Sequence, residues 1–263
     1  MGRWGRCGYR SPVDSDASDG AADPTAASVD PTGLTGVMEA VQGARSALAA
    51  LHHHPANHRG WPRTAAAASV RAARASAVME GGNATLDPDV ETVRDPVLAG
   101  ALRAAASIGS MCTVWERSPL QALARLHTLA AADLVQDQAL LGRPVRASEQ
   151  LSALARLVIH PPWPGPVLAA VVHAELLTQQ PFGVADGVIA RAAARLVAIT
   201  SGLDPHGLGV PEVAQMRAGG QYRQLAAGFA SGSDEGIRRW IIASCQWLAA
   251  GAREGNSIAE AAG

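Results

Sequence analysis

This sequence contains no lysine, so its basic side chains, apart from histidine, are all arginine. The arginines and the acidic side chains nearly cancel, and the formal net charge is -1 at pH 7. A net charge this close to zero supplies no general attraction for nucleic acid or for an anionic lipid surface. We therefore expect neither nucleic acid nor a membrane as a partner.

Cysteine and long hydrophobic runs are also scarce. The cysteines Cys7, Cys112 and Cys245 are odd in number and lack the spacing of a metal site or a disulfide framework. No apolar run of the signal-peptide type follows Met1, and no stretch approaches the roughly 18 apolar residues of a membrane-spanning helix. A reducing, cytoplasmic environment fits these features best.

Aromatic residues make up only 4% of the chain, although apolar residues make up 48%. The core must therefore be built mostly from alanine, valine and leucine, and alanine favours helix because its side chain loses no entropy there. At 263 residues and 27.0 kDa, the chain is long enough for one domain with a substantial core. No alternating strand pattern extends beyond a few residues, so the sequence predicts an all-α fold.

The apolar pattern divides the chain into four segments. Residues 1–31 are rich in Asp, Ser, Ala, Pro and Gly, and we expect a disordered tail because they offer too little apolar surface to offset the entropy of ordering. Residues 32–64 are expected to form an N-terminal helix and a linker, residues 65–255 a helical domain, and residues 256–263 a flexible C-terminus. The predicted helices cover residues 34–51, 65–79, 96–114, 120–134, 151–159, 166–177, 189–200, 211–216, 221–229 and 233–250.

Residues 180–191 read Q-P-F-G-V-A-D-G-V-I-A-R and lie between two strongly apolar segments. Pro181, Gly183 and Gly187 disfavour a regular helix, so the stretch predicts a loop that joins two central helices. Asp186 is placed to cap the second helix through its carboxylate. The N-terminus of that helix is a favourable place for an anion, because free N–H groups and the helix dipole both point toward it.

This stretch resembles the signature of the Fic (Fido) family, H-P-F-x-[DE]-G-N-G-R-x-x-R, aligned without gaps. The signature is matched by Pro181, Phe182, Gly187 and Arg191. The other five positions differ. Gln180 occupies the position of the family's catalytic His, and Val184 that of its metal-binding acid. Ala185, Asp186 and Val188 occupy the positions of its first Gly, its phosphate-contacting Asn and its first Arg. The resemblance implies a Fic-type helical bundle around the two central helices, with the loop at its functional site.

A motif upstream of the loop adds to the resemblance. Ser76, Glu80 and Gly81 form the pattern S-x-x-x-E-G near the end of a predicted helix, where Ser76 and Glu80 share a face. The pattern resembles the family's inhibitory-helix motif, [ST]-x-x-x-E-[GN], in the arrangement in which that helix precedes the core. The resemblance implies that Glu80 pairs with Arg191, the final arginine of the signature. The alternative is an exposed glutamate near a helix end.

Other segments extend the resemblance over roughly residues 65–254, which is most of the chain expected to be ordered. The segment L-A-R-L-H-T-L around His127 contains a Leu-His pair that the family often has, although a lone histidine on an apolar helix is more often a core residue. Residues 142–146 resemble the family's Gly-x-x-Arg turn, and Tyr222, Asp234 and Trp240 resemble its closing helices. In active relatives a β-hairpin flap that docks target segments follows the turn. Here residues 147–149 lead directly into a predicted helix, so we expect a shortened flap.

Members of the family typically transfer AMP from ATP, bound with Mg²⁺, to a protein hydroxyl. Gln180 cannot act as the general base, because an amide is not basic enough to accept a proton near neutral pH. Val184 offers no oxygen to Mg²⁺, Asp186 adds negative charge where phosphate would bind, and Val188 removes one guanidinium. These substitutions predict no metal site, no bound cofactor, and a Fido-fold protein that has lost adenylyl transfer and works by binding a protein partner or as a scaffold.

Two alternatives are open at this point. The first is a nucleotidyl or phosphoryl transferase with altered chemistry, whose base is supplied by Asp186, His173 or His127. Asp186 would suit this role if burial raised its pKa. The second is an unrelated helical domain with an accidental likeness to the signature, and the matching segments on both sides of the loop argue against it.

Overall fold

The computed structural model describes residues 30–85 and 93–262. Within these residues every regular element is a helix and no strand is present, which confirms the all-α prediction. The predicted tail lies outside the described residues except for Asp30 and Pro31, which are ordered. Pro31 is buried at the start of a 3-10 helix (Pro31–Gly33), and the Asp30 carboxylate accepts a hydrogen bond from Thr32 N at 3.0 Å.

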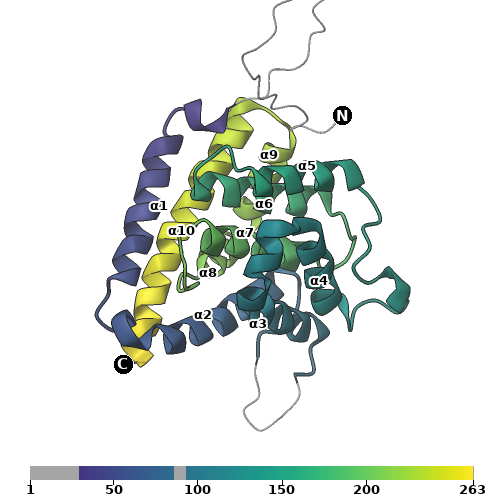
Figure 1. The fold of residues 1–263 in the computed structure, drawn as a ribbon, viewed down its shortest axis with the longest axis horizontal. Coiled ribbons are helices and arrows are strands. Elements are labelled where there is room, and N and C mark those ends of the chain that lie inside the picture. Colours follow the sequence, from purple (N-terminus) through teal and green to yellow (C-terminus); the bar gives the residue numbers. More distant parts are fainter. Residues whose placement is uncertain (1–29, 86–92, 263) are drawn as a thin grey trace, which may run out of the picture.

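Two helices, α6 (Gly165–Gln179) and α7 (Asp186–Thr200), lie in the middle of the molecule (Figure 1). Both are buried on most sides rather than along one stripe, which explains why their sequences are apolar or small nearly throughout. The prediction of two central helices joined by a loop is confirmed, but the loop is shorter than predicted. It covers residues 180–185, because residues 186–191 form the first turns of α7 and Gly187 lies within the helix.

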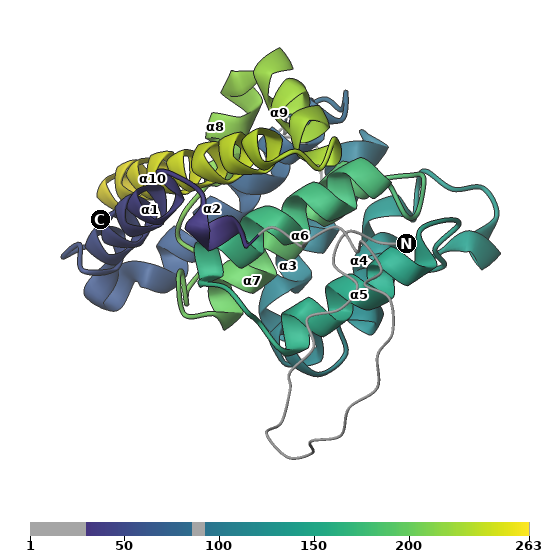
Figure 2. The same cartoon turned by 90° about the horizontal axis from the view of Figure 1, so that it is seen from above.

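The remaining helices pack around this pair (Figure 2). One side of the pair is covered by α3 (Pro96–Arg117), α4 (Pro119–Ala131) and α5 (Ser148–Ile159), and the other by α1 (Val37–His52), α9 (Gly220–Ala230) and α10 (Asp234–Ala262). Small residues allow close crossings, because a Cβ at Gly100 of α3 would overlap the carbonyl of Ala130 of α4. The scarce aromatic residues are concentrated where α6, α9 and α10 meet, with Tyr222, Phe229, Trp240 and Trp247 in one cluster.

Helix α2 (Asn57–Met79) begins earlier than the sequence predicted. The linker predicted up to residue 64 is wrong, because residues 57–64 form the first turns of α2 and Pro62 lies inside the helix. The Asn57 side chain stabilises this early start. Its Nδ2 donates to the carbonyl of Leu51 at 2.9 Å, and its Oδ1 accepts from the Thr64 hydroxyl at 2.8 Å. The first bond joins the start of α2 to the end of α1, and the second holds the first turns of α2 together.

Helix α10 continues far beyond the end predicted at residue 250. The flexible C-terminus predicted for residues 256–263 is wrong for the described residues, since α10 extends to Ala262 and buries Ile258 and Ala259. Glycine usually weakens a helix interior, but Gly251 and Gly255 allow α10 to lie directly against the chain that leads into α8 (Pro211–Ala218). In Figure 1, α1 runs beside α10 along one edge of the molecule.

By length and composition alone, α3 is apolar enough to cross a membrane. The expectation that no stretch approaches this length is therefore wrong. A core helix of a folded domain can pass the same test, and α3 packs against α2, α4 and α7 with Leu98, Met111 and Trp115 in the main core. The apolar composition of α3 is explained by its place in the core, so we assign the helix no membrane role.

Candidate functional site

The loop of residues 180–185 has an unusual backbone conformation. Gln180 and Ala185 adopt left-handed φ values of 47° and 59°, and Gly183 between them has a φ of 79°. A left-handed conformation costs a non-glycine residue roughly 1–2 kcal/mol, so neighbouring contacts must hold this loop in place. The carbonyl of Pro181 accepts hydrogen bonds from the backbone N–H groups of Val145 and Arg146, at 2.8 and 3.2 Å.

Val145 and Arg146 belong to the turn of residues 142–146, which directly precedes residues 147–149, where a shortened flap was expected. Residues 141–147 form turns and a left-handed residue, Ala147, before α5 begins at Ser148. No hairpin is present among these described residues. The segment lies against the loop instead, with Val145 54% exposed. These described residues thus form a turn and no docking strand.

Asp186 does not cap α7, and this prediction is wrong. Ala185 occupies the N-cap position, and Asp186 is the first residue of the helix. Its Oδ1 accepts a hydrogen bond from Phe182 N at 3.0 Å, so the carboxylate turns back and closes the loop. Asp186 is 7% exposed, and this burial raises the pKa of its carboxyl to about 6, although the Phe182 and Gly183 N–H groups and Arg146 oppose the shift.

This raised pKa predicts a pH-dependent loss of stability. Because the folded pKa lies above the ordinary 3.8, the stability from neutral Asp186 is complete below about pH 4 and is lost as pH rises through about 6. The shift corresponds to about 3 kcal/mol. We expect Asp186→Asn, which keeps the hydrogen-bond acceptor, to raise the free energy of unfolding by about 2 kcal/mol or more near pH 8 and by much less near pH 4.

The check is urea unfolding of wild type and variant at both pH values. Asp137→Asn is a matched control, because Asp137 is exposed and its Oδ1 also accepts a backbone N–H, from Ala139 at 2.9 Å. An equal effect of Asp186→Asn at both pH values would contradict the burial argument.

Arg191 lies 2% exposed in α7, and its guanidinium is surrounded by acceptors. Its Nε donates to the Ser76 hydroxyl at 2.8 Å, and one terminal nitrogen donates to the Ser76 carbonyl at 3.2 Å and to Glu80 Oε1 at 2.7 Å. The other terminal nitrogen donates to the Tyr222 hydroxyl at 3.3 Å. The structure therefore places the upstream motif directly against the last arginine of the loop motif.

Glu80 also fills the space at the N-terminus of α7. A Cβ added to Gly187 would overlap the Glu80 carboxylate, so any other residue at 187 would force the Glu80 side chain out of its present position. Gly81, with a φ of 83°, ends α2 just after this contact. The position expected to attract an anion is occupied by a carboxylate of the chain itself. Beside it, Val188 is 5% exposed and packs in the main core.

Two histidines named as candidate bases are buried. His173 is 2% exposed, and its Nε2 lies 2.7 Å from the Tyr222 hydroxyl. Burial, followed by the positive charge of Arg191, lowers the pKa of His173 to about 3, so its ring is neutral at physiological pH. Tyr222 thus links His173 to Arg191. Its role at the site was missed, because the sequence places it 31 residues from Arg191 with no local pattern.

His127 supports the loop from the opposite side. Its ring stacks on Phe182 with centroids 4.5 Å apart, and its Nδ1 accepts a hydrogen bond from Gly142 N at 2.8 Å. His127 is 1% exposed, and burial lowers its pKa. The histidine therefore connects the Gly-x-x-Arg turn to the loop and is not accessible to a substrate.

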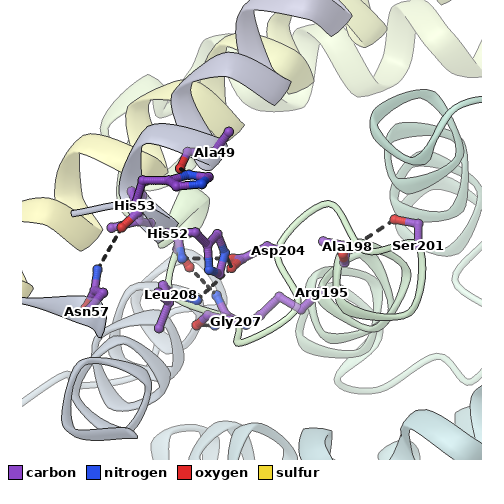
Figure 3. Close-up of polar contacts among 12 residues, drawn as sticks. Ala49, His52, His53, Asn57, Arg195, Ala198, Ser201, Asp204, Gly207 and Leu208 are labelled. Atoms are coloured by element: carbon purple, nitrogen blue, oxygen red, sulfur yellow. Dashed lines mark hydrogen bonds and ion pairs between the residues drawn. The ribbon is translucent and has the colours of Figure 1, made fainter. Parts of the chain in front are cut away.

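A second polar cluster lies at the other end of α7 (Figure 3). His52 Nε2 lies 2.8 Å from Asp204 Oδ1, and the Asp204 carboxylate also accepts from the N–H groups of Leu208 and Gly209, both at 2.9 Å. Burial alone would raise the pKa of Asp204, but His52, Arg195 and these N–H groups outweigh it and lower the pKa. Sequence reasoning missed this cluster, because His52 and Asp204 are 152 residues apart.

Arg195 extends this cluster. It donates to the carbonyls of Gly209 and Gly207, at 2.8 and 2.9 Å, and lies 3.3 Å from Glu212 Oε2. These contacts fix the segment between α7 and α8. Among the described residues, no group of three or more His, Cys, Asp or Glu side chains is placed to hold a metal ion.

Comparison with known proteins identifies the fold. No protein-family model matches the sequence, and no curated protein matches it significantly. Among solved structures, the chain is similar to a Fic family protein from Desulfovibrio desulfuricans G20, with a TM-score of 0.68 and 18% identity, covering 85% of this chain and 74% of that one. It is also similar to Fic-1 from C. elegans, with a TM-score of 0.60 and 13% identity, covering 86% and 74%. The chain therefore has the Fic-type fold that the sequence resemblance implied.

Proposed function

We propose that this Fic-fold chain has lost adenylyl transfer and acts by binding a protein partner or as a scaffold. The observation that carries the proposal is Gln180, an exposed amide at the position of the family's catalytic histidine. An amide cannot accept the proton of a hydroxyl nucleophile near neutral pH. The two histidines considered as alternative bases, His127 and His173, are each buried and hydrogen-bonded within the protein. Neither is placed to replace the missing base.

The charges around the α7 N-terminus also disfavour a bound nucleotide. The Glu80 carboxylate occupies the space next to Gly187, and Asp186 adds a second carboxyl group nearby. Like charges at close range repel, so both groups oppose phosphate. Arg191, the matching arginine of the signature, already donates to Ser76, Glu80 and Tyr222. Val184 supplies no oxygen ligand for Mg²⁺.

A second candidate function rests on Asp186. Its carboxyl has a pKa of about 6, which suits a general base near neutral pH. This would permit a nucleotidyl or phosphoryl transferase with an altered motif. Against it, Asp186 is 7% exposed and its carboxylate accepts the Phe182 N–H, so a substrate hydroxyl would have to displace that contact.

Isothermal calorimetry with ATP, in the presence and absence of Mg²⁺, distinguishes the two candidates. We expect no heat of binding under either condition, because the anion position is filled and a metal ligand is missing. Micromolar binding that requires Mg²⁺ would contradict the proposal and favour the altered transferase. A Glu80→Gln variant titrated in parallel tests whether the Glu80 charge alone excludes the nucleotide.

The setting of this function is also proposed. The chain's near-zero net charge supports a protein partner over nucleic acid or a membrane, and its sparse, unpaired cysteine pattern supports a cytoplasmic location. The turn at residues 141–147 supports a partner that does not dock as an added strand.

A further inference from the structure

A cavity of about 40 Å³ lies inside the molecule between α6, α7, α8 and α10. Its lining is mostly apolar, with Leu48, Ile199 and Leu248 among the apolar side chains. It also includes His173, Arg191 and Asp204 and a polar group made of Arg195, Glu212, Gln215 and Ser244. Gln215 and Ser244 are 5% and 6% exposed. Arg191 and His173 belong to the site described above, but none of the contacts given for the loop or for Glu80 involves Gln215 or Ser244. The proposed function therefore leaves these two side chains without a role.

Two of these side chains have unsatisfied hydrogen-bonding atoms. Gln215 Oε1 and Ser244 Oγ are buried without a hydrogen-bond partner among the described residues. A buried polar atom without a partner is costly, and most such atoms in folded proteins are paired with protein groups or ordered water. Two of them from different helices, α8 and α10, line this same cavity.

We propose that this cavity binds a cluster of about three ordered water molecules that bridges Gln215 to Ser244. A water molecule needs roughly 10–15 Å³ of such space and two to four polar partners, and this cavity supplies both. Water donates to Gln215 Oε1, and it donates to or accepts from the Ser244 hydroxyl. Arg195 and Glu212 line the same space and provide further partners.

This water cluster adds a polar connection between α8 and α10, two helices that already pack against each other. The 3.3 Å Arg195–Glu212 pair already connects α7 with α8. The bridging water adds α10 to this connection through Ser244. Loss of the bridge therefore weakens the packing of α8 against its neighbours and leaves the Gln180 loop unchanged.

The sign of a stability change tests the proposal. In a hydrated cavity, Ser244→Ala removes a hydrogen-bond partner of bound water and lowers the Tm by about 2–4 °C. In a dry cavity the same change removes an unsatisfied hydroxyl and leaves the Tm equal or higher. Ser257→Ala is the matched control, because Ser257 is an exposed serine on the same helix and the two changes alter helix propensity equally.

The second readout is the water itself. Nuclear Overhauser contacts between long-lived water and the Ser244 and Gln215 amide groups are expected in the wild-type protein and are expected to weaken in Ser244→Ala. The proposal requires both results. A Tm for Ser244→Ala equal to or above that of Ser257→Ala, or the absence of water contacts in wild type, would overturn it.

Discussion

We expect replacement of Glu80 by glutamine to lower the free energy of unfolding by about 3 kcal/mol and to switch on no nucleotide transfer. Removing one partner of a buried ion pair typically costs about 3–5 kcal/mol, because the remaining charge is left without compensation. Arg191 is 2% exposed whereas the Glu80 side chain is 32% exposed, so the lower end of that range applies. For a domain of this size the loss corresponds to a Tm decrease of about 6–12 °C.

Thermal unfolding and a nucleotide-labelling assay on the same Glu80→Gln protein check both parts of this expectation. Glutamine is preferred to glycine, since glycine at the end of α2 would itself reduce stability. Glu116→Gln provides the control, because Glu116 is exposed on α3 and its substitution should stay within about 0.5 kcal/mol. An unchanged Tm would exclude the structural role, and new labelling would reveal an enzyme restrained by Glu80.

The second large effect concerns activity. We expect Gln180→His alone to restore none, even though a general base is worth about 10²–10⁴-fold in rate. The base has no substrate to act on until metal and phosphate can bind. Val184→Asp and Asp186→Asn are the least additional changes, and the structure adds Glu80→Gln, because the Glu80 carboxylate fills the space beside Gly187.

Labelling by the combined variant, with none from Gln180→His, is the pattern this account predicts. Gln179→His is the matched control, since it adds the same side chain one residue earlier. Labelling by Gln180→His alone would show that Val184 and Asp186 do not block nucleotide binding.

The helices at the centre of the fold could be predicted because their signals are local. Apolar runs and abundant alanine favour helix on both sides of the loop, and Pro181 and Gly183 interrupt it. The extension of α10 could not be predicted this way. Gly251 and Gly255 disfavour a helix locally, but they allow α10 to pack closely against the segment that leads into α8, which is distant in the sequence.

The parts of the candidate site that belong to a sequence motif could be predicted. The positions of side chains that depend on contacts between distant segments could not. The resemblance of the motif predicted that Glu80 pairs with Arg191, and the structure brings these two together. The contact of Ser76 with Arg191 was not predicted. The direction of the Asp186 carboxylate depends on the left-handed backbone of Ala185, which an alanine does not signal. Tyr222 reaches Arg191 only through the packing of α9 on α6.

The central claim, that this Fic-type fold no longer transfers nucleotides, is tested most directly by labelling. Purified wild-type protein is incubated alone or with a cell lysate and radiolabelled ATP, GTP or UTP, in Mg²⁺ or Mn²⁺. The account predicts no label on the protein itself or on any lysate protein. A labelled band that disappears with Gln180→Ala would contradict it.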